Sequence, residues 1–417
     1  MSSVQDNLIA ALDVGSSKVA SLIARVEPDG SLTALGFANR QCLGMKNGVV
    51  VDPSAVEHAI KDAMDHAEHM AGLDKIEEIY VSCSAGSPRS RIIEVDVSID
   101  GHEVGHTDVS RVLTTARQQI NPEDGRILHA FPVAFGLDGT FSVHAPISMF
   151  GDSLSVAMHV ISVNESPVKN LERVVERAPL SMSALVSSAY ANGLAVLDEN
   201  EVRLGTTCID IGGGTTEISM FAEHALVHQE VLLYGGDMLT ERIARKLMTP
   251  YSEAEKLKVR GSAIVDPADE RSIIDVLQIG ESEDGEEGFI RMPKSELTFI
   301  MQNYFEELFY QIKAALKDTG LNEVAGQNIV LTGGVAQCDG IAELATRILG
   351  SRTRIGTPKG VDAMPDVALK PQFATVVGML IYAQRSPDRL RKKRVKQGVS
   401  ESHGLFNRIS GWFKNEF

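Results

Sequence analysis

Apolar positions along the chain fall into short strand-like runs separated by segments of helical periodicity. Two runs resemble each other: "LIAALDVGSSKVASLIA" around Asp13 and "TTCIDIGGGTTEISMFA" around Asp210. Each contains an apolar strand, an Asp, a turn of Gly, Ser or Thr, and a second strand rich in β-branched residues. This pattern is typical of a β-hairpin and not of a strand followed by a helix. The repeat predicts a chain with two related halves.

The segments after each hairpin predict an α/β lobe. After the first hairpin, "SLTALGFANRQ" and "IEEIYVSCSA" have strand character, and "PSAVEHAIKDAMDHAEHMAG" between them has helical periodicity with a Ser-capped start. After the second, "GGDMLTERIARKLM", "SEAEKLKVRGSA" and the long "SELTFIMQNYFEELFYQIKAALKDTG" are predicted helices, followed by a buried strand in "NIVLTGGVAQ". This order predicts two lobes, each a mixed sheet with crossover helices.

Three stretches depart from this order. Residues 83–164 alternate like strands around one short helix, which predicts an inserted α+β subdomain. The charge run "GESEDGEEG" is most simply a solvated loop. From about Arg385 the sequence becomes basic and polar, which is typical of a flexible linker.

The predicted fold class is therefore α/β, with duplicated mixed-sheet cores and an inserted α+β subdomain. The expected division is a first-lobe core at 1–82, the inserted subdomain at 83–164, the first-lobe core again at 165–203, a second-lobe core at 204–235, a lower subdomain of the second lobe at 236–325, the second-lobe core again at 326–366, a return to the first lobe at 367–386, a basic linker at 387–403 and an amphipathic helix at 404–417.

Composition narrows the function classes. The 417 residues are 43% hydrophobic, enough for large cores, and the formal net charge of −16 argues against general nucleic-acid binding. The four cysteines lie far apart, without the paired spacing of a zinc or redox site, and are expected to be buried free thiols in a reducing cytoplasm. Because no apolar stretch reaches the ~20 residues that span a bilayer, the sequence predicts a protein that is neither secreted nor transmembrane.

The two Asp-containing turns suggest anion binding. Short side chains let successive backbone N–H groups approach an anion, and a neighbouring carboxylate can hold Mg²⁺ through water. One such turn alone is usually just a tight hairpin, but two facing each other could clamp a triphosphate. A third feature strengthens this interpretation: "NIVLTGGVAQ" ends a buried strand in Gly333 and Gly334, which have no side chains to obstruct a flat ligand.

These three elements, in this order, resemble the ATP-binding core shared by actin, the heat-shock chaperones and the sugar kinases, which implies a two-lobe ATPase fold with ATP and Mg²⁺ as cofactors. By that resemblance the first phosphate loop comprises Asp13, Gly15, Ser16, Ser17 and Lys18, and the second comprises Asp210, Gly212, Gly213, Gly214 and Thr215. The remaining implied contacts are Gly333 and Gly334 beside the adenosine, Glu255 and Lys258 within reach of the ribose, and Gly235, Gly236 and Asp237 on the lower side of the site. Asp13 and Asp210 are the expected catalytic carboxylates and hold Mg²⁺ through water.

Hydrolysis requires a water oriented in line with the terminal phosphate. Many relatives of this core have Glu-Pro in the helix between the lobes, whereas "LVSSAYANGLAVL" has Ser188-Ala189 there. We therefore expect at most slow turnover, with ATP acting chiefly as a conformational ligand.

The last residues, "GLFNRISGWFKNEF", predict an amphipathic helix. Its apolar stripe consists of Leu405, Phe406, Ile409, Trp412 and Phe413, with Arg408 and Lys414 beside it. The helix is too short to span a bilayer but suits the membrane interface, and the linker cations would add attraction to anionic lipid. The alternative is a terminal helix docked on the protein's own core.

The actin-type core, the inserted subdomain and the terminal helix together resemble the FtsA family of bacterial cell-division proteins, through "DVGSSKV", "IDIGGGTTEI", "LTGGVAQ", "FATVVGML" and "WFKNEF". The resemblance covers essentially the whole chain. It implies head-to-tail polymerisation, tethering of FtsZ filaments to the cytoplasmic face of the inner membrane at the division site, and recruitment of later division proteins. It also makes Met292–Tyr304, where the long helix begins with Lys294, the candidate surface for the FtsZ tail.

Other interpretations have less support. A sugar or acid kinase needs a substrate-activating Asp outside the phosphate loops, and the sequence suggests no candidate. A chaperone would need a peptide-binding domain in place of a short tail. The pilus-assembly relative of this family lacks a comparable amphipathic tail. A possible metal array of His58, Asp62, His66 and His69 on one helix face is more simply a solvated surface.

Overall fold

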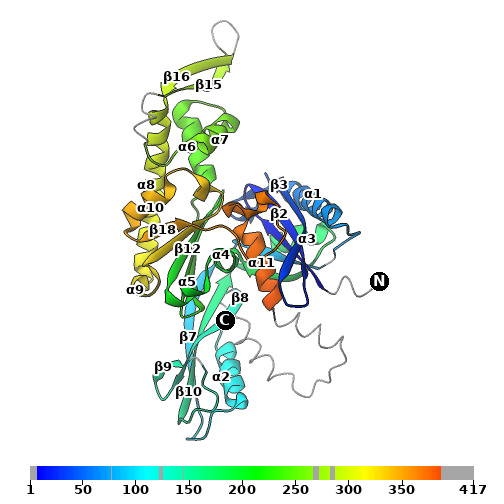
Figure 1. Cartoon of the computed structure of the whole chain (residues 1–417), viewed down its shortest axis with the longest axis vertical. Helices are drawn as coiled ribbons and strands as arrows, with labels where there is room; N and C mark the ends of the chain where they lie inside the picture. The colour runs from blue at the N-terminus through cyan, green and yellow to red at the C-terminus, as the bar shows by residue number, and fades with distance from the viewer. Residues whose placement is uncertain are drawn as a thin grey trace.

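A computed structural model describes residues 7–76, 78–121, 125–143, 145–265, 272–281 and 287–386. The molecule is elongated, with a central two-lobe body and an arm at each end (Figure 1). The solvated loop predicted around residues 280–288 falls largely outside the described residues, and the predicted linker and amphipathic helix fall wholly outside them.

The first lobe is built on a five-stranded sheet with the order β11-β6-β1-β2-β3. Its strands are β1 (Leu8–Val14), β2 (Lys18–Val26), β3 (Leu32–Gln41), β6 (Glu78–Cys83) and β11 (Ser181–Ser187). The β1–β2 and β2–β3 pairs are antiparallel, whereas β1–β6 and β6–β11 are parallel. Helices α1 (Pro53–Ala71) and α3 (Glu165–Arg177) bury their apolar sides with residues of this sheet in one hydrophobic cluster.

The second lobe repeats this topology in the order β14-β13-β12-β17-β18. Its strands are β12 (Thr206–Ile211), β13 (Thr216–Ala222), β14 (Ala225–Leu232), β17 (Asn328–Thr332) and β18 (Arg352–Ile355). Three consecutive antiparallel strands are again followed by two parallel ones. The prediction of two related mixed-sheet halves is confirmed.

Two helices, α4 (Ser188–Val196) and α11 (Ala374–Arg385), lie between the sheets (Figure 1). They share one hydrophobic cluster with strands of both lobes, including Leu22 of β2 and Phe221 of β13. A Cβ on Gly378 of α11 would collide with the carbonyl oxygen of Ala191 in α4, so the two helices are in backbone contact. This layer joins the lobes.

The lower arm in Figure 1 is the insertion predicted from the sequence. It comprises β7 (Arg89–Ser98), α2 (His106–Gln118), β8 (Arg126–Leu137), β9 (Thr140–Val143) and β10 (Ser153–Val163). The strands form a sheet in the order β7-β10-β8-β9, and α2 packs on it around Val109, Val112 and Ala116.

The upper arm extends from the second lobe (Figure 1). It contains α6 (Gly236–Leu247), α7 (Tyr251–Arg260), the hairpin of β15 (Ile273–Glu281) and β16 (Glu287–Pro293), and the long α8 (Lys294–Asp318). The other elements are β4 (Met45–Lys46), β5 (Val49–Val50), α5 (Glu199–Leu204), α9 (Asn322–Ala325) and α10 (Ile341–Leu349), with short 3-10 turns at η3 (Val335–Gln337), η4 (Asp366–Leu369) and η5 (Pro371–Phe373).

Two local predictions are wrong. Helix α1 is capped by Asp52, whose carboxylate accepts hydrogen bonds from the Ser54 and Ala55 amides, because Pro53 occupies the first helical position and leaves the preceding residue as the cap. Cys42, Cys83 and Cys208 are buried free thiols as expected, but Cys338 is only partly buried. Of the helices within the described residues, none combines the length and apolar character needed to cross a membrane.

Candidate functional site

The two predicted loops have the same backbone turn. The Gly15 amide donates to the Lys18 carbonyl and the Gly212 amide to the Thr215 carbonyl, each at 2.9 Å. In the strand registers, Asp13 pairs with Ala20 and Asp210 pairs with Glu217. The two Asp-bearing hairpins are therefore structural equivalents, one in each lobe.

The hairpins meet at their tips. A Cβ on Gly213 would lie 3.1 Å from the side chain of Ser17, and a Cβ on Gly214 would collide with the Ser16 hydroxyl and lie 2.9 Å from the Asn47 amide nitrogen. Glycine is needed at these positions because the opposing loop leaves no room for a side chain. The fold thus brings the two predicted phosphate loops face to face.

Helix α6 begins against the second loop. The Gly236 amide donates to the Gly212 carbonyl at 2.9 Å, and the Asp237 amide donates to the Gly213 carbonyl at 2.8 Å. A Cβ on Gly235 would collide with the Gly213 backbone. The predicted lower side of the site therefore lies next to this loop.

Asp13 is buried at the end of β1. The Ser82 hydroxyl donates to its Oδ1 at 2.8 Å and in turn accepts from the Val14 amide at 3.0 Å. Burial raises the pKa of the Asp13 carboxyl, while the nearby Lys18 ammonium opposes that shift.

Asp210 belongs to a second buried carboxylate pair. The amide nitrogen of Asn192 in α4 donates to Asp210 Oδ2 at 2.7 Å and to Glu217 Oε2 at 3.3 Å. Burial raises the pKa of both carboxyls. The charge of Asp13 adds to the shift at Asp210, where Lys18 opposes it, and the charges of Asp210 and Asp13 add to the shift at Glu217. The Lys18 ammonium itself lies 5.4 Å from the ring centroid of Phe373.

Asp13, Asp210 and Glu217 are thus three buried carboxylates of one site, and Lys18 is the cation that opposes the pKa shift at Asp13 and Asp210. This excess of negative charge suits a bound cation. Within the described ranges, no group of three or more His, Cys, Asp or Glu side chains is close enough to hold a metal directly. A cation held through water by Asp13 and Asp210 fits this spacing and stays a prediction.

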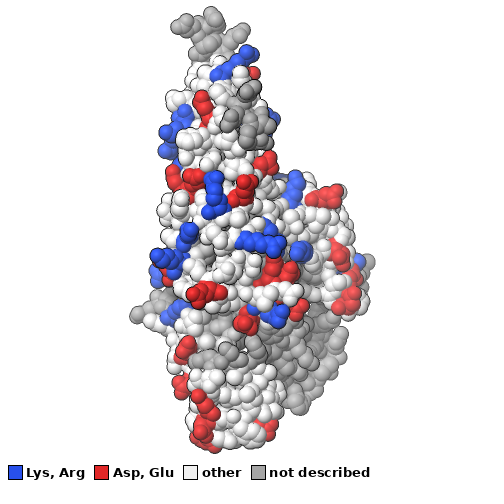
Figure 2. Space-filling view, turned by 60° about the vertical axis from the view of Figure 1, so that its left-hand side comes forward, with Lys and Arg blue, Asp and Glu red and all other residues white. Residues whose placement is uncertain are grey.

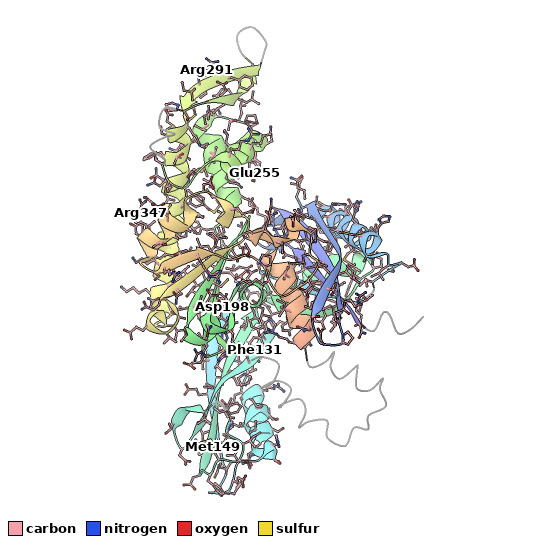
Figure 3. The ribbon with its side chains drawn as sticks, viewed as in Figure 1. Phe131, Met149, Asp198, Glu255, Arg291 and Arg347 are labelled. Atoms are coloured by element: carbon pink, nitrogen blue, oxygen red, sulfur yellow. The ribbon has the colours of Figure 1, made fainter. Side chains whose placement is uncertain are left out.

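The predicted ribose contacts lie on α7 in the upper arm, where Figure 3 labels Glu255. Lys258 Nζ is 2.7 Å from Glu255 Oε2, 2.9 Å from Thr240 Oγ1 and 3.2 Å from the Gly236 carbonyl. The pair is therefore positioned over the start of α6. Burial raises the pKa of Asp237, with Lys258 opposing the shift.

Gly333 closes the other side of the second hairpin. Its φ is +89°, and a Cβ there would collide with Asp210 Oδ1, so both conformation and space require glycine. A Cβ on Gly334 would have only the Gln372 side chain within 4 Å, at 3.9 Å. Gly333 therefore packs against Asp210, whereas Gly334 does not.

The sequence interpretation missed Ser82, Asn192, Glu217 and Thr375. Glu217 carried a signal, because it is the one charged residue in β13, a strand that is buried at every position. The others are small polar residues whose role depends on contacts between distant segments. Ser188 and Ala189, at the place of the expected Glu-Pro, are both buried at the start of α4.

The histidines of α1 interact with their own helix. His58 Nδ1 is 2.8 Å from the Ser54 carbonyl, and His66 Nδ1 is 3.0 Å from the Asp62 carbonyl. These contacts are those of side chains on a helix surface.

Comparison with known proteins decides the family. The chain is 39% identical to the cell division protein FtsA of Rhizobium meliloti (strain 1021), over 100% of this chain and 96% of that protein. The chain belongs to the FtsA family. FtsA of Escherichia coli (strain K12) is 30% identical over 98% of both chains. The family model "Cell division protein FtsA" matches residues 207–378, and "SHS2 domain inserted in FTSA" matches residues 85–162.

Solved structures show the same fold at lower identity. A chain of a PilM-PilN type IV pilus biogenesis complex has a TM-score of 0.61 at 17% identity, covering 90% of this chain and 98% of that one. MreB5 of Spiroplasma citri bound to ADP has a TM-score of 0.56 at 14% identity, covering 94% and 99%. The chain therefore has the actin-like, two-lobe α/β fold, as predicted.

Proposed function

We propose that this FtsA-family protein binds ATP and tethers FtsZ filaments to the cytoplasmic face of the inner membrane at the division site. The observation that carries the proposal is the pair of equivalent Asp-bearing hairpins held tip to tip in a chain of this family. Head-to-tail polymerisation and recruitment of later division proteins belong to the same proposal.

The phosphates would lie against the two turns. Asp13 and Asp210 would bind the water ligands of Mg²⁺, and Lys18 would be the side-chain cation nearest the phosphates. Bound Mg²⁺ would supply charge neutralisation of the phosphate oxygens. The fold's likeness to a nucleotide-bound MreB5 supports this assignment. Adenosine would lie near Gly333 and Gly334, and Glu255 and Lys258 would bind the ribose.

Turnover is expected to be slow at most. The segment where many actin-like proteins carry a Glu has Ser188 and Ala189, both buried and neither able to act as a base. ATP then serves chiefly to favour one arrangement of the lobes.

The proposed surface for the FtsZ tail is narrower than the range Met292–Tyr304. Met292 and Tyr304 are buried, and the Tyr304 hydroxyl donates to the Gly235 carbonyl at 2.6 Å. Lys294 is partly exposed and Phe299 is 63% exposed, so the proposal rests on these two residues in the first turns of α8. A cation and an exposed aromatic ring suit a peptide with acidic and apolar residues.

The proposed membrane contact is made by the apolar stripe and two flanking cations of the predicted helix at 404–417, which lies outside the described residues. Anionic inner-membrane lipid is the proposed partner, because the flanking and linker residues are basic while the whole chain is acidic.

The test is co-pelleting of the full chain with purified FtsZ filaments and anionic liposomes, with and without ATP and Mg²⁺. The full chain is expected to bring FtsZ down with the lipid, and deletion of residues 404–417 is expected to release the protein from lipid while FtsZ binding remains. A truncated chain that pellets with lipid as well as the full chain does would reject the tethering role of the tail. Lys294→Glu is the corresponding variant for the FtsZ surface, with Lys317→Glu, exposed near the other end of α8, as its control.

A further inference from the structure

The start of helix α11 is attached to the nucleotide site from both lobes. From the first hairpin, Lys18 lies over the Phe373 ring. From the second lobe, the Thr332 hydroxyl donates to the Pro371 carbonyl at 3.1 Å. Residues 371–375 therefore run between the elements that carry the two hairpins.

The strongest connection is through Asn192, which is 1% exposed and uses its whole side-chain amide. The nitrogen donates to Asp210 and Glu217, and the oxygen accepts from the Thr375 hydroxyl of α11 at 2.9 Å. A flipped amide would place its oxygen against two carboxylates. The amide therefore has one favourable orientation, fixed by the carboxylates, and in that orientation its oxygen meets the Thr375 hydroxyl, which also interacts with Asp210.

Close packing makes this connection stiff. Gly378 lies almost one turn beyond Thr375 on α11, and a Cβ there would collide with the Ala191 carbonyl, next to Asn192. The hydrogen bond and the backbone contact occur at the same point of the α4–α11 interface. If Asn192 moves along this interface, α11 must move with it.

We infer that Asn192 and Thr375 couple occupancy of the nucleotide site to helix α11. The inference rests on the proposed function, because the ligand that acts on Asp210 is the nucleotide with its cation. Asn192 is a positioning residue: it sets the direction of the Asp210 and Glu217 carboxylates. The Thr375 hydroxyl joins α11 to this group, because it interacts with both Asn192 and Asp210. Because α11 is the last described helix before the predicted linker, it is the element through which bound nucleotide would act on the proposed membrane-binding segment.

The experiment measures amide hydrogen exchange of residues 374–385 in the full chain, with and without saturating ATP and Mg²⁺. We expect ATP to slow exchange there at least about threefold in the wild type. Thr375→Val should lose the slowing even when ATP is added to saturation, as judged from that variant's own Kd in calorimetry. Thr375→Ser keeps the hydroxyl and should keep the slowing. Asn192→Ala should lose the slowing and also weaken ATP binding about tenfold.

Thr207→Val is the matched control. Its hydroxyl is buried and donates to the Ala325 carbonyl at 2.9 Å, so the substitution removes a comparable hydrogen bond away from α11. It should lower stability without changing the response of α11. Gly378→Ala tests the same coupling in a second way, because its methyl group forces α4 away from α11 and so breaks the bond without changing the chemistry of Asn192 or Thr375.

The outcomes separate the two proposals. Thr375→Val and Gly378→Ala chains that still show the full slowing in α11 would overturn the coupling. A wild-type chain that binds ATP with no change in α11 would overturn the coupling alone. A wild-type chain that binds no ATP in calorimetry would overturn the proposed function, and the coupling with it.

Discussion

His129 of β8 is buried against the central helices, in ring contact with Tyr190 of α4 and Tyr382 of α11. Phe131, labelled in Figure 3, lies two residues farther along the same strand. His129 Nε2 accepts a hydrogen bond from the Ser187 amide at 2.9 Å, and the His129 ring stacks on Phe131 with centroids 5.0 Å apart. Burial lowers the pKa of His129 to about 3, and burial with the neighbouring His228 lowers the pKa of His159 to about 4. Both imidazoles are therefore neutral in the folded protein at neutral pH.

This burial predicts a stability that falls with acidification. An unfolded chain takes up a proton on each imidazole below about pH 6.5, whereas the folded chain does not until near the lowered pKa values. The stability is present above pH 6.5 and is lost as pH falls, by up to about 1.4 kcal/mol per pH unit for each histidine.

Urea unfolding at pH 7.5, 6.0 and 5.0 tests this. His129→Gln keeps an acceptor for the Ser187 amide, and its free energy of unfolding should fall less steeply with acidification than that of the wild type. His58→Gln, on the exposed side of α1, is the control and should keep the wild-type slope. An unchanged slope in His129→Gln would show that His129 is not neutral in the fold.

Asp210 allows a separate test of charge in the site. Asp210→Asn removes one of three interacting buried carboxylates, so the free energy of unfolding without ligand should stay the same or rise, because less charge is buried. Protection against heat by ATP and Mg²⁺ should nevertheless be lost, because the neutral side chain no longer attracts the cation's water shell. Thermal unfolding with and without ATP and Mg²⁺ measures both effects.

The control for this variant is Asp198→Asn, at the N-cap of α5, where Asn also caps a helix. It should keep the full ATP-dependent protection. If Asp210→Asn retained that protection as well, Asp210 would have no part in cation binding.

At the scale of elements, the local sequence pattern predicted those structures that form within one short segment. The two hairpins follow from strand alternation around Gly-rich turns, and their similarity predicted the repeated sheet. Only the family resemblance indicated a helix between the lobes at "LVSSAYANGLAVL". Local pattern does not indicate it, because α4 is almost entirely buried and has no polar side to give it an amphipathic signature. The Asn192–Thr375 bond joins residues 183 positions apart, and no local pattern contains such a contact.

The close approach of the hairpins gives an element-scale prediction. Gly214→Ala would place a methyl group against Ser16 and the Asn47 amide, so the two tips must separate. We expect ATP affinity to fall by about tenfold, which corresponds to about 1.4 kcal/mol. Calorimetric titration with ATP and Mg²⁺ measures the change.

Gly288→Ala in the β15–β16 hairpin is the matched control, because the nearest atom to its new methyl group is 4.0 Å away. The double variant Ser16→Gly with Gly214→Ala removes the Ser16 side chain, with which the new methyl group would collide, and should recover part of the ATP affinity. Normal binding by Gly214→Ala alone would mean that the tips are farther apart in the ATP-binding state.

At the scale of the whole molecule, the two hairpins meet in the central body, and the arms extend away from it (Figure 1). The base of the upper arm contributes α6 and α7 to the site. On the face shown in Figure 2, acidic side chains predominate at the end formed by the inserted subdomain, whereas both signs of charge are interspersed over the middle. Anionic lipid would be repelled by that acidic end, so a basic segment elsewhere is needed for attraction to a membrane.

This arrangement predicts where a nucleotide stabilises the chain. Because both hairpins would contact the ligand, ATP with Mg²⁺ at 100 times its Kd should raise the free energy of unfolding by about 2.7 kcal/mol.

Hydrogen exchange should slow at both turns, Gly15–Lys18 and Gly212–Thr215, because the ligand bridges the lobes. It should stay unchanged in α2, which packs within the inserted subdomain and away from the site. Removing Mg²⁺ with EDTA should reverse most of the protection at both turns together, since the carboxylates that would share the cation's water shell lie one in each lobe. Protection confined to a single turn would mean that ATP binds one lobe without bridging to the other.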